Sequence, residues 1–477
     1  GTVAHHAPVL VVTASGREAE DLSAELSAMM GAKVAYFPAW ETLPHERLSP
    51  APDIVGKRAR VLDLVGAGKA QVVVTSARGY CQPVLSEVEG RAPIFLKEEA
   101  EHEFSHIVSE LEFRAYKHVD MVAKRGEYAT RGGILDIFPT TSDYPVRVEF
   151  WGDEITDIRQ FSVADQRAFS EIEVGEVTIY PARELPITNE VAARARELSQ
   201  KFGGNAALAE LLTKVGEHIP ADGMEALLAV LAEGSFVTLP ELLPTGTHVL
   251  LVAPEKIRTR IADLESTDSE FLAAGWEAAA MGADGPLAAE GLDTESSSYR
   301  SYESLEATCA AINAPLWTFA PPGMFAAAES ETLPLDFEPG PTPRGDIEQI
   351  DAMMAQLLAH TTAGGRAAFI APAQGAIKRM VERFAEKGIP TKVATPGWEP
   401  SPGEVTLYQA LSHAGLVFPK VRKLKDAEAL PLVVVTETDL TGNRVGDIAG
   451  AKRRPAKRRN RVDPLALKQG DYVVHET

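Results

Sequence analysis

The sequence predicts a multidomain α/β protein, and three observations lead to this class. At 477 residues the chain is long enough for about three domains. Buried strands and amphipathic helices alternate near both ends, which is typical of a parallel sheet with helices on its faces. Between them lie short alternating strands separated by turn residues. We therefore expect a parallel α/β domain, an antiparallel α+β insertion, a helical and α/β segment, and a second small α/β domain.

The first hundred residues carry the parallel pattern. Residues 8–13 (Pro-Val-Leu-Val-Val-Thr) form an expected buried strand, and a helix follows from about Arg17 to a stop at Gly31. Further strands are expected over 33–37 and 71–75, with a helix between them over about 53–65. The apolar stripe of the first helix has helical spacing and consists of Ala19, Leu22, Leu26 and Met29.

Residues 102–187 carry the antiparallel pattern. Strands are expected over 133–138, 146–151 and 155–161, with turns at 139–143 (Pro-Thr-Thr-Ser-Asp) and 152–153 (Gly-Asp). The chain then becomes Ala- and Glu-rich and mainly helical up to residue 345. Within that segment 284–298 is expected to be a loop, and 339–344 (Pro-Gly-Pro-Thr-Pro-Arg) a linker.

The α/β pattern returns over residues 346–440. A strand is expected over 369–372, and the next helix ends at Gly388. Further strands are expected over 391–394, 405–408 and 432–435. The helix has an apolar face at i, i+3, i+4 and i+7, formed by Ile377, Met380, Val381 and Phe384.

Composition and charge limit the functional classes. No apolar run reaches about 18 residues, and the start (Gly-Thr-Val) has no signal-peptide pattern. Because only two cysteines occur, Cys81 and Cys309, a Cys-rich metal site is excluded, and we expect core thiols in a reducing cytoplasm. The start is unusual for a native chain, so we expect that residues upstream have been lost.

The net charge of −21 is unevenly distributed. Outside one basic stretch the chain carries 40 basic and 68 acidic residues, which repel phosphates, so most of it should face proteins or water. The basic stretch is suited to nucleic acid or an acidic partner, although a solvated linker explains it equally well. It contains Lys452, Arg453, Arg454, Lys457, Arg458, Arg459 and Arg461.

Neither glycine-containing turn completes a phosphate-binding loop. Residues 66–70 (Gly-Ala-Gly-Lys-Ala) come closest, but Asp63 holds the earlier glycine position and Ala70 the magnesium-binding Ser/Thr position. The turn over 13–17 (Thr-Ala-Ser-Gly-Arg) follows a strand but has no lysine. The acidic pair at 153–154 imitates the acidic motif of ATPases, but it lies in a tight turn, where Gly-Asp is a common sequence. We therefore expect no nucleotide cofactor in this chain.

A zinc site is a second candidate, since 102–106 (His-Glu-Phe-Ser-His) matches H-E-x-x-H. On a helix, His102 and His106 would lie one turn apart, with Glu103 as general base. The charged residues 97–101 before it are unlike the apolar helix of zinc proteases, and a solvated helical face is the simpler interpretation. Third ligands would come from Glu110, Glu112 or His118.

The strand over 146–151 (Val-Arg-Val-Glu-Phe-Trp) indicates a protein-binding surface. Its strict alternation sends Val146, Val148 and Phe150 to the core side and Arg147, Glu149 and Trp151 to the outer side. Trp and Arg are the residues most enriched at binding hot spots. The alternative is that Trp151 covers a neighbouring domain of this chain.

Several stretches resemble the bacterial transcription-repair coupling factors (Mfd), and they do so in the same order along nearly the whole chain. The last of them begins at residue 470 and reads Gly-Asp-Tyr-Val-Val-His-Glu. The others are residues 36–44 (Tyr-Phe-Pro-Ala-Trp-Glu-Thr-Leu-Pro), 126–139 (Gly-Glu-Tyr-Ala-Thr-Arg-Gly-Gly-Ile-Leu-Asp-Ile-Phe-Pro), 147–155, 438–440 and the basic stretch.

The resemblance implies that the chain is the N-terminal half of such a factor, with a degenerate P-loop-type first domain. ATP, magnesium and double-stranded DNA would then be bound by a motor beyond Thr477, in a parent that translocates on DNA. The implied domains are a UvrB-like domain 1a (1–101), domain 2 (102–187), domain 1b (188–345), a species-variable third domain (346–440), a basic linker (441–461) and the start of the RNA-polymerase-interacting domain (462–477).

The resemblance also implies a surface for the repair protein UvrA. The family's two arginines fall on Arg131 and Arg147, and its aromatic residue falls on Trp151, where some members have phenylalanine. The assignment of Arg131 to this surface rests on the resemblance alone. We thus predict an adaptor that recruits UvrA to stalled RNA polymerase and is not itself catalytic. The alternatives are a UvrB-like damage-binding ATPase, the zinc hydrolase and a purely structural scaffold.

Overall fold

The computed structural model describes residues 7–44, 46, 48–86, 90–164, 166–202, 206–232, 236–280, 298–319, 337–395, 399–410, 412, 414–422 and 429–441. It divides into two compact units, Gly1–Glu331 and Thr332–Thr477. Parallel, antiparallel and mixed sheets occur with helices packed on them, which confirms the predicted multidomain α/β class. The basic stretch at 452–461 and the segment 462–477 lie outside the described residues.

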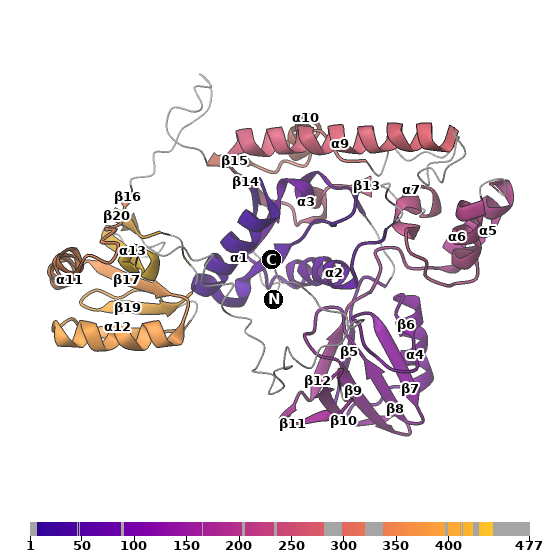
Figure 1. Cartoon of the computed structure of the whole chain (residues 1–477), viewed down its shortest axis with the longest axis horizontal. Helices are drawn as coiled ribbons and strands as arrows, with labels where there is room; N and C mark the ends of the chain where they lie inside the picture. The colour runs from indigo at the N-terminus through magenta and orange to yellow at the C-terminus, as the bar shows by residue number, and fades with distance from the viewer. Residues whose placement is uncertain are drawn as a thin grey trace, which may run out of the picture. The chain divides into compact units, whose positions relative to one another are not determined.

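The first unit is organised around a five-stranded parallel sheet in the order β15-β14-β1-β3-β2 (Figure 1). The three strands expected near the N-terminus are confirmed. The other two come from the segment expected to be mainly helical, so distant parts of the chain share one sheet. The bounds are β1 (Val9–Thr13), β2 (Val34–Phe37), β3 (Val72–Ser76), β14 (His248–Val252) and β15 (Leu316–Phe319).

Helices cover both faces of this sheet. On one face, α1 (Gly16–Met30) packs Ala19 against Val11 and Val74. Ser15 caps the start of this helix, and Gly31 adopts a φ of 70° just after its end, as the sequence predicted. The other face is covered by α2 (Pro52–Gly66), α3 (Ala77–Cys81), α9 (Pro254–Ala280) and α10 (Tyr302–Ala311).

A six-stranded sheet, ordered β11-β10-β9-β8-β7-β6, forms the antiparallel part; only the β6–β7 pair is parallel. Its inner face packs against α4 (Phe104–Phe113) and the two-stranded β5–β12 ribbon. The expected strands are confirmed. The bounds are β5 (Ile94–Lys97), β6 (Lys117–His118), β7 (Glu127–Arg131), β8 (Ile134–Ile137), β9 (Val146–Trp151), β10 (Glu154–Phe161), β11 (Ala168–Glu173) and β12 (Glu176–Ile179).

Short elements complete the first unit. The α5–α6 hairpin packs around Val191, Leu198 and Leu212 in a core of its own. A small antiparallel pair joins β4 to β13. The bounds are β4 (Val84–Leu85), α5 (Asn189–Lys201), α6 (Ala206–Gly216), α7 (Leu228–Leu231), β13 (Phe236–Val237) and α8 (Leu239–Leu242).

The second unit contains a mixed sheet ordered β16-β20-β21-β17-β19-β18. The strands β18, β19, β17 and β21 run parallel, while β20 and β16 are antiparallel. The strands expected over 346–440 are confirmed, whereas β20 was not foreseen. The bounds are β16 (Glu338–Pro339), α11 (Ile347–Thr362), β17 (Arg366–Ala371), α12 (Gln374–Glu386), β18 (Thr391–Ala394), β19 (Val405–Gln409), β20 (Leu416–Arg422), β21 (Ala429–Thr436) and α13 (Glu437–Thr441).

Candidate functional site

Strand β9 alternates in burial as its sequence predicts. Val146, Val148 and Phe150 are buried against α4 and the ribbon, whereas Trp151 exposes 81% of its surface. We call the opposite side of the six-stranded sheet its outer face. Because Trp151 is so exposed, no described part of the first unit covers its indole.

Arg147 lies on the same outer face but is held within the sheet. Its Nε and Nη2 donate to the two carboxylate oxygens of Asp136 at 2.7 and 2.8 Å. Asp136 is only 5% exposed, and the Arg147 guanidinium also lies 5.1 Å from the centre of the Phe161 ring. The hydrogen bonds to Asp136 raise the pKa of Arg147. The guanidinium is therefore always charged and fixed in orientation, with a quarter of the side chain exposed.

Arg131 ends β7 and belongs to the same face. It lies opposite Ile134, which in turn lies opposite Glu149, so the register aligns these residues across three strands. Arg131 is exposed, and its Nη2 donates to the backbone oxygen of Asp120 at 2.9 Å. The structure thus brings Arg131, Arg147 and Trp151 onto one face, and we call these three residues the candidate docking surface, or docking surface for short.

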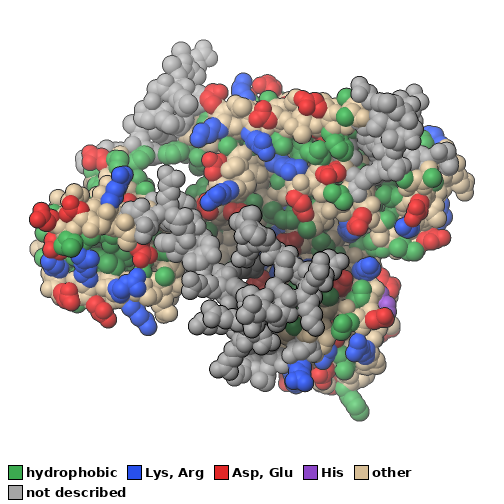
Figure 2. All heavy atoms as spheres, in the orientation of Figure 1, with side chains coloured by type: hydrophobic (Ala, Val, Ile, Leu, Met, Phe, Trp, Pro, Cys, Tyr) green, Lys and Arg blue, Asp and Glu red, His purple; other side chains and the backbone are tan. Residues whose placement is uncertain are grey.

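The glycines between β7 and β8 allow this close strand packing. Gly132 has a φ of 62°, as a tight turn requires. A Cβ atom on Gly133 would lie 2.7 Å from the backbone oxygen of Phe150. Figure 2 shows hydrophobic, basic and acidic side chains next to one another at the lower end of this part of the molecule.

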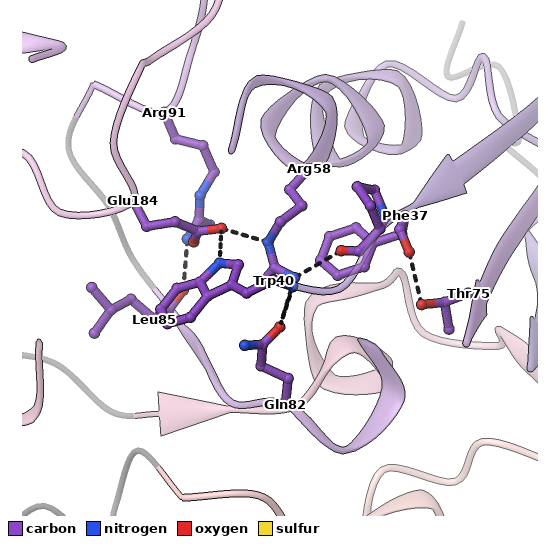
Figure 3. Close-up of polar contacts among 9 residues, drawn as sticks. Phe37, Trp40, Arg58, Thr75, Gln82, Leu85, Arg91 and Glu184 are labelled. Atoms are coloured by element: carbon purple, nitrogen blue, oxygen red, sulfur yellow. Dashed lines mark hydrogen bonds and ion pairs between the residues drawn. The ribbon is translucent and has the colours of Figure 1, made fainter. Parts of the chain in front are cut away.

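A buried polar junction joins the antiparallel part to the parallel sheet, and sequence reasoning missed it (Figure 3). Arg58 of α2 is 2% exposed and forms an ion pair with Glu184, which follows β12. Arg58 also donates to Pro38 O at 3.0 Å, and its guanidinium lies 4.4 Å from the centre of the Phe37 ring. Trp40 Nε1 donates to the same Glu184 oxygen at 3.1 Å. No local pattern marks Arg58, because every partner is distant in sequence.

The helical premise of the zinc alternative is wrong. Helix α4 begins at Phe104, with Glu103 as its N-cap residue, so His102 lies outside the helix. The backbone N–H of His102 donates instead to Asp153 O at 2.7 Å. His102 and His106 are therefore not one helical turn apart. Within the described ranges, no three His, Cys, Asp or Glu side chains are grouped so as to hold a metal ion.

The turn at the phosphate-loop position is closed by its own side chains. Glu18 N donates to Ser15 Oγ at 3.3 Å, and Ser15 N donates to Glu18 Oε2 at 3.1 Å. A cleft of about 710 Å³ lies beside this turn, lined in part by Lys256 and Arg260. Ser15 and Glu18 thus form a capping box that satisfies the start of α1.

The two cysteines are core residues, as expected. Cys81 and Cys309 are both buried, and burial raises the pKa of the Cys81 thiol to about 12. A thiol with so high a pKa is not a nucleophile at neutral pH. Among the described residues, no helix combines the length and apolarity needed to cross a membrane.

The fold defines a multidomain α/β protein in which a largely antiparallel domain is inserted into a parallel α/β part. Residues 94–185 match the model of the UvrB interaction domain, which covers the six-stranded sheet, α4 and the β5–β12 ribbon. Over 99% of its length the chain is 43% identical to the transcription-repair-coupling factor of Mycobacterium bovis. It is 33% identical to that of Escherichia coli over 38% of the chain, or 16% of the relative, and 30% identical to that of Myxococcus xanthus over 50%, or 21% of the relative.

The chain is therefore a homologue of the transcription-repair-coupling factors. Almost the whole chain aligns with the mycobacterial relative, but it spans only 38% of that relative's length.

Proposed function

We propose that this chain is the adaptor part of a transcription-coupled repair factor and recruits UvrA through the docking surface. Two independent observations support the proposal. Residues 94–185 match a UvrB interaction domain. On the outer face of that same domain, a tryptophan is 81% exposed, and two arginines lie on the same face. We further infer that the parallel part is a degenerate P-loop-type domain, and that polymerase binding, ATP hydrolysis and DNA translocation belong to the longer parent.

The energetics of the docking surface fit a hot spot. A tryptophan buries about 150–250 Å² when fully covered, so covering the 81% of Trp151 that is exposed is worth about 3–5 kcal/mol at about 25 cal/mol per Å². The guanidinium groups supply orientation and charge-assisted hydrogen bonds. Because Asp136 holds Arg147 in place before binding, little side-chain entropy is lost when a partner docks there.

The test is titration calorimetry of this chain with UvrA. Trp151→Ala should weaken binding by about 30-fold or more, which corresponds to about 2 kcal/mol. Its melting temperature should stay unchanged, because the indole supports nothing in the free chain. Phe95→Ala is the matched control, since Phe95 is 50% exposed in the same domain but lies on the β5–β12 ribbon. Unchanged affinity in Trp151→Ala would refute the assignment of this face.

A further inference from the structure

The outer face continues beyond the docking surface into a second apolar area. Val122, Ala129, Phe138 and Phe161 form a small core there, with Val119 packed against it. The segment 119–122 therefore lies across the outer face at the opposite end from Trp151. Met121, within this segment, exposes 56% of its surface, whereas Val122 beside it is fully buried in the small core.

A second exposed apolar side chain is fixed beside this segment. Val163 follows β10 and is 38% exposed. The Nε2 atom of Gln166 donates to Val122 O at 3.2 Å and to Val163 O at 3.0 Å, so one amide ties the two segments together. Gln166 does this with a φ of 59°, in the left-handed region that non-glycine residues rarely adopt. The residue after Met121 and Val163 itself are thus bonded to the same Gln166 side chain, which links the two segments that carry these exposed apolar residues.

The charged residues of the docking surface connect to this second area. Arg131 donates to Asp120 O, directly before Met121, and Arg147 lies over Phe161 of the small core. Exposed single apolar residues are ordinary on protein surfaces. Here, however, the segment that carries Met121 packs on the outer face, which already carries an exposed tryptophan and two arginines, and Gln166 links it to Val163.

We propose that Met121 and Val163 form a second apolar contact for UvrA, an inference that rests on the proposed function. The matching UvrA surface then carries two apolar recesses, one for Trp151 and one for the Met121–Val163 pair. It also carries a carboxylate opposite Arg131, because among the described residues the guanidinium of Arg131 donates only to a backbone oxygen and has no acidic partner. A single anchor leaves the rotation of the partner open, whereas two separated anchors fix it.

Titration calorimetry with UvrA tests this, using Met121→Ala, Val163→Ala and their double variant beside Trp151→Ala. We expect about a five-fold loss for Met121→Ala, about a three-fold loss for Val163→Ala and more than a ten-fold loss for the double variant. Phe95→Ala should bind like the unchanged chain. Arg131→Glu should lose more affinity than Arg131→Ala, because it places like charges opposite each other.

The outcomes separate this inference from the function on which it rests. If Trp151→Ala weakens binding while the Met121 and Val163 variants stay within two-fold of the unchanged chain, the second contact is wrong and the adaptor role stands. If none of these variants, Trp151→Ala included, changes affinity, both proposals fail. Equal losses in Phe95→Ala would show that the effect is not specific to this face and would also overturn the inference.

Discussion

The ion pair between Arg58 and Glu184 should contribute strongly to stability, and Glu184→Gln tests it. Both side chains are buried, with 2% and 11% exposed. The glutamine keeps the shape and an oxygen that accepts from Arg58 and from Trp40 Nε1, but it removes the negative charge. A buried guanidinium then faces only neutral acceptors, namely Gln82 Oε1 at 3.3 Å and Pro38 O at 3.0 Å.

The expected loss follows from that geometry. Removing one partner of a buried pair typically destabilises by about 3–5 kcal/mol, because an uncompensated charge stays buried. Because neutral acceptors and the retained amide oxygen still bond to Arg58, we expect a smaller loss in the free energy of unfolding, about 2–3 kcal/mol. With about 2 cal/mol/K of unfolding entropy per residue, a unit of roughly 330 residues should lose about 3–4 °C in melting temperature.

Differential scanning calorimetry measures this shift, and two variants sharpen the result. Glu210→Gln is the control, because Glu210 and its partner Lys214 are 69% and 49% exposed, and water screens such a pair, so the melting temperature should stay unchanged. Adding Arg58→Met to Glu184→Gln should recover part of the loss, since the buried guanidinium that Glu184 compensates is then removed as well. A Glu184→Gln chain as stable as the unchanged one, within about 0.5 kcal/mol, would refute the reasoning.

Two further predictions concern packing and pH. Gly56→Ala should destabilise the first unit by about 2 kcal/mol or more in denaturant unfolding, because the new Cβ would clash with Thr140 Oγ1. Gly66→Ala in the same helix is the control. Its new Cβ would have no atom within 4 Å, so this variant should be neutral or slightly stabilising. Burial raises the pKa of Asp268 to about 6, so its contribution to stability is present at low pH and is lost as pH rises through that value. Asp268→Asn should therefore gain stability over the unchanged chain between about pH 4 and about pH 7, by about 2 kcal/mol; a difference that does not change with pH would contradict this.

Much of the fold could be predicted because its signals are local. The apolar run that forms β1, the helical stripe of α1 and the alternation of β9 lie within single elements, and each was predicted to within one or two residues. The strands β14 and β15 were missed. They are four or five residues long in an Ala- and Glu-rich segment, and their place beside β1 depends on long-range pairing that no local pattern encodes.

The H-E-x-x-H prediction failed for a related reason. Spacing in sequence indicates helical spacing only if the helix begins early enough. Here the residue before His102, Glu101, bridges Glu154 of β10, and His102 itself bonds to Asp153. These long-range contacts hold the chain extended and delay the helix to Phe104. Tertiary strand pairing, and not local spacing, therefore determines where this helix begins.

At the candidate site, too, the local sequence pattern did not reveal contacts between residues that are distant in sequence. Alternation placed Arg147 and Trp151 on one face, but it could not show that Arg147 is already paired. That pairing changes how variants must be interpreted. Arg147→Ala would leave the buried carboxylate of Asp136 without its cation, so it should weaken the domain as well as any docking. Trp151 has no such internal role, because its indole is 81% exposed. A loss of UvrA binding in Arg147→Ala thus mixes two causes, whereas a loss in Trp151→Ala without a change in melting temperature reports the contact itself.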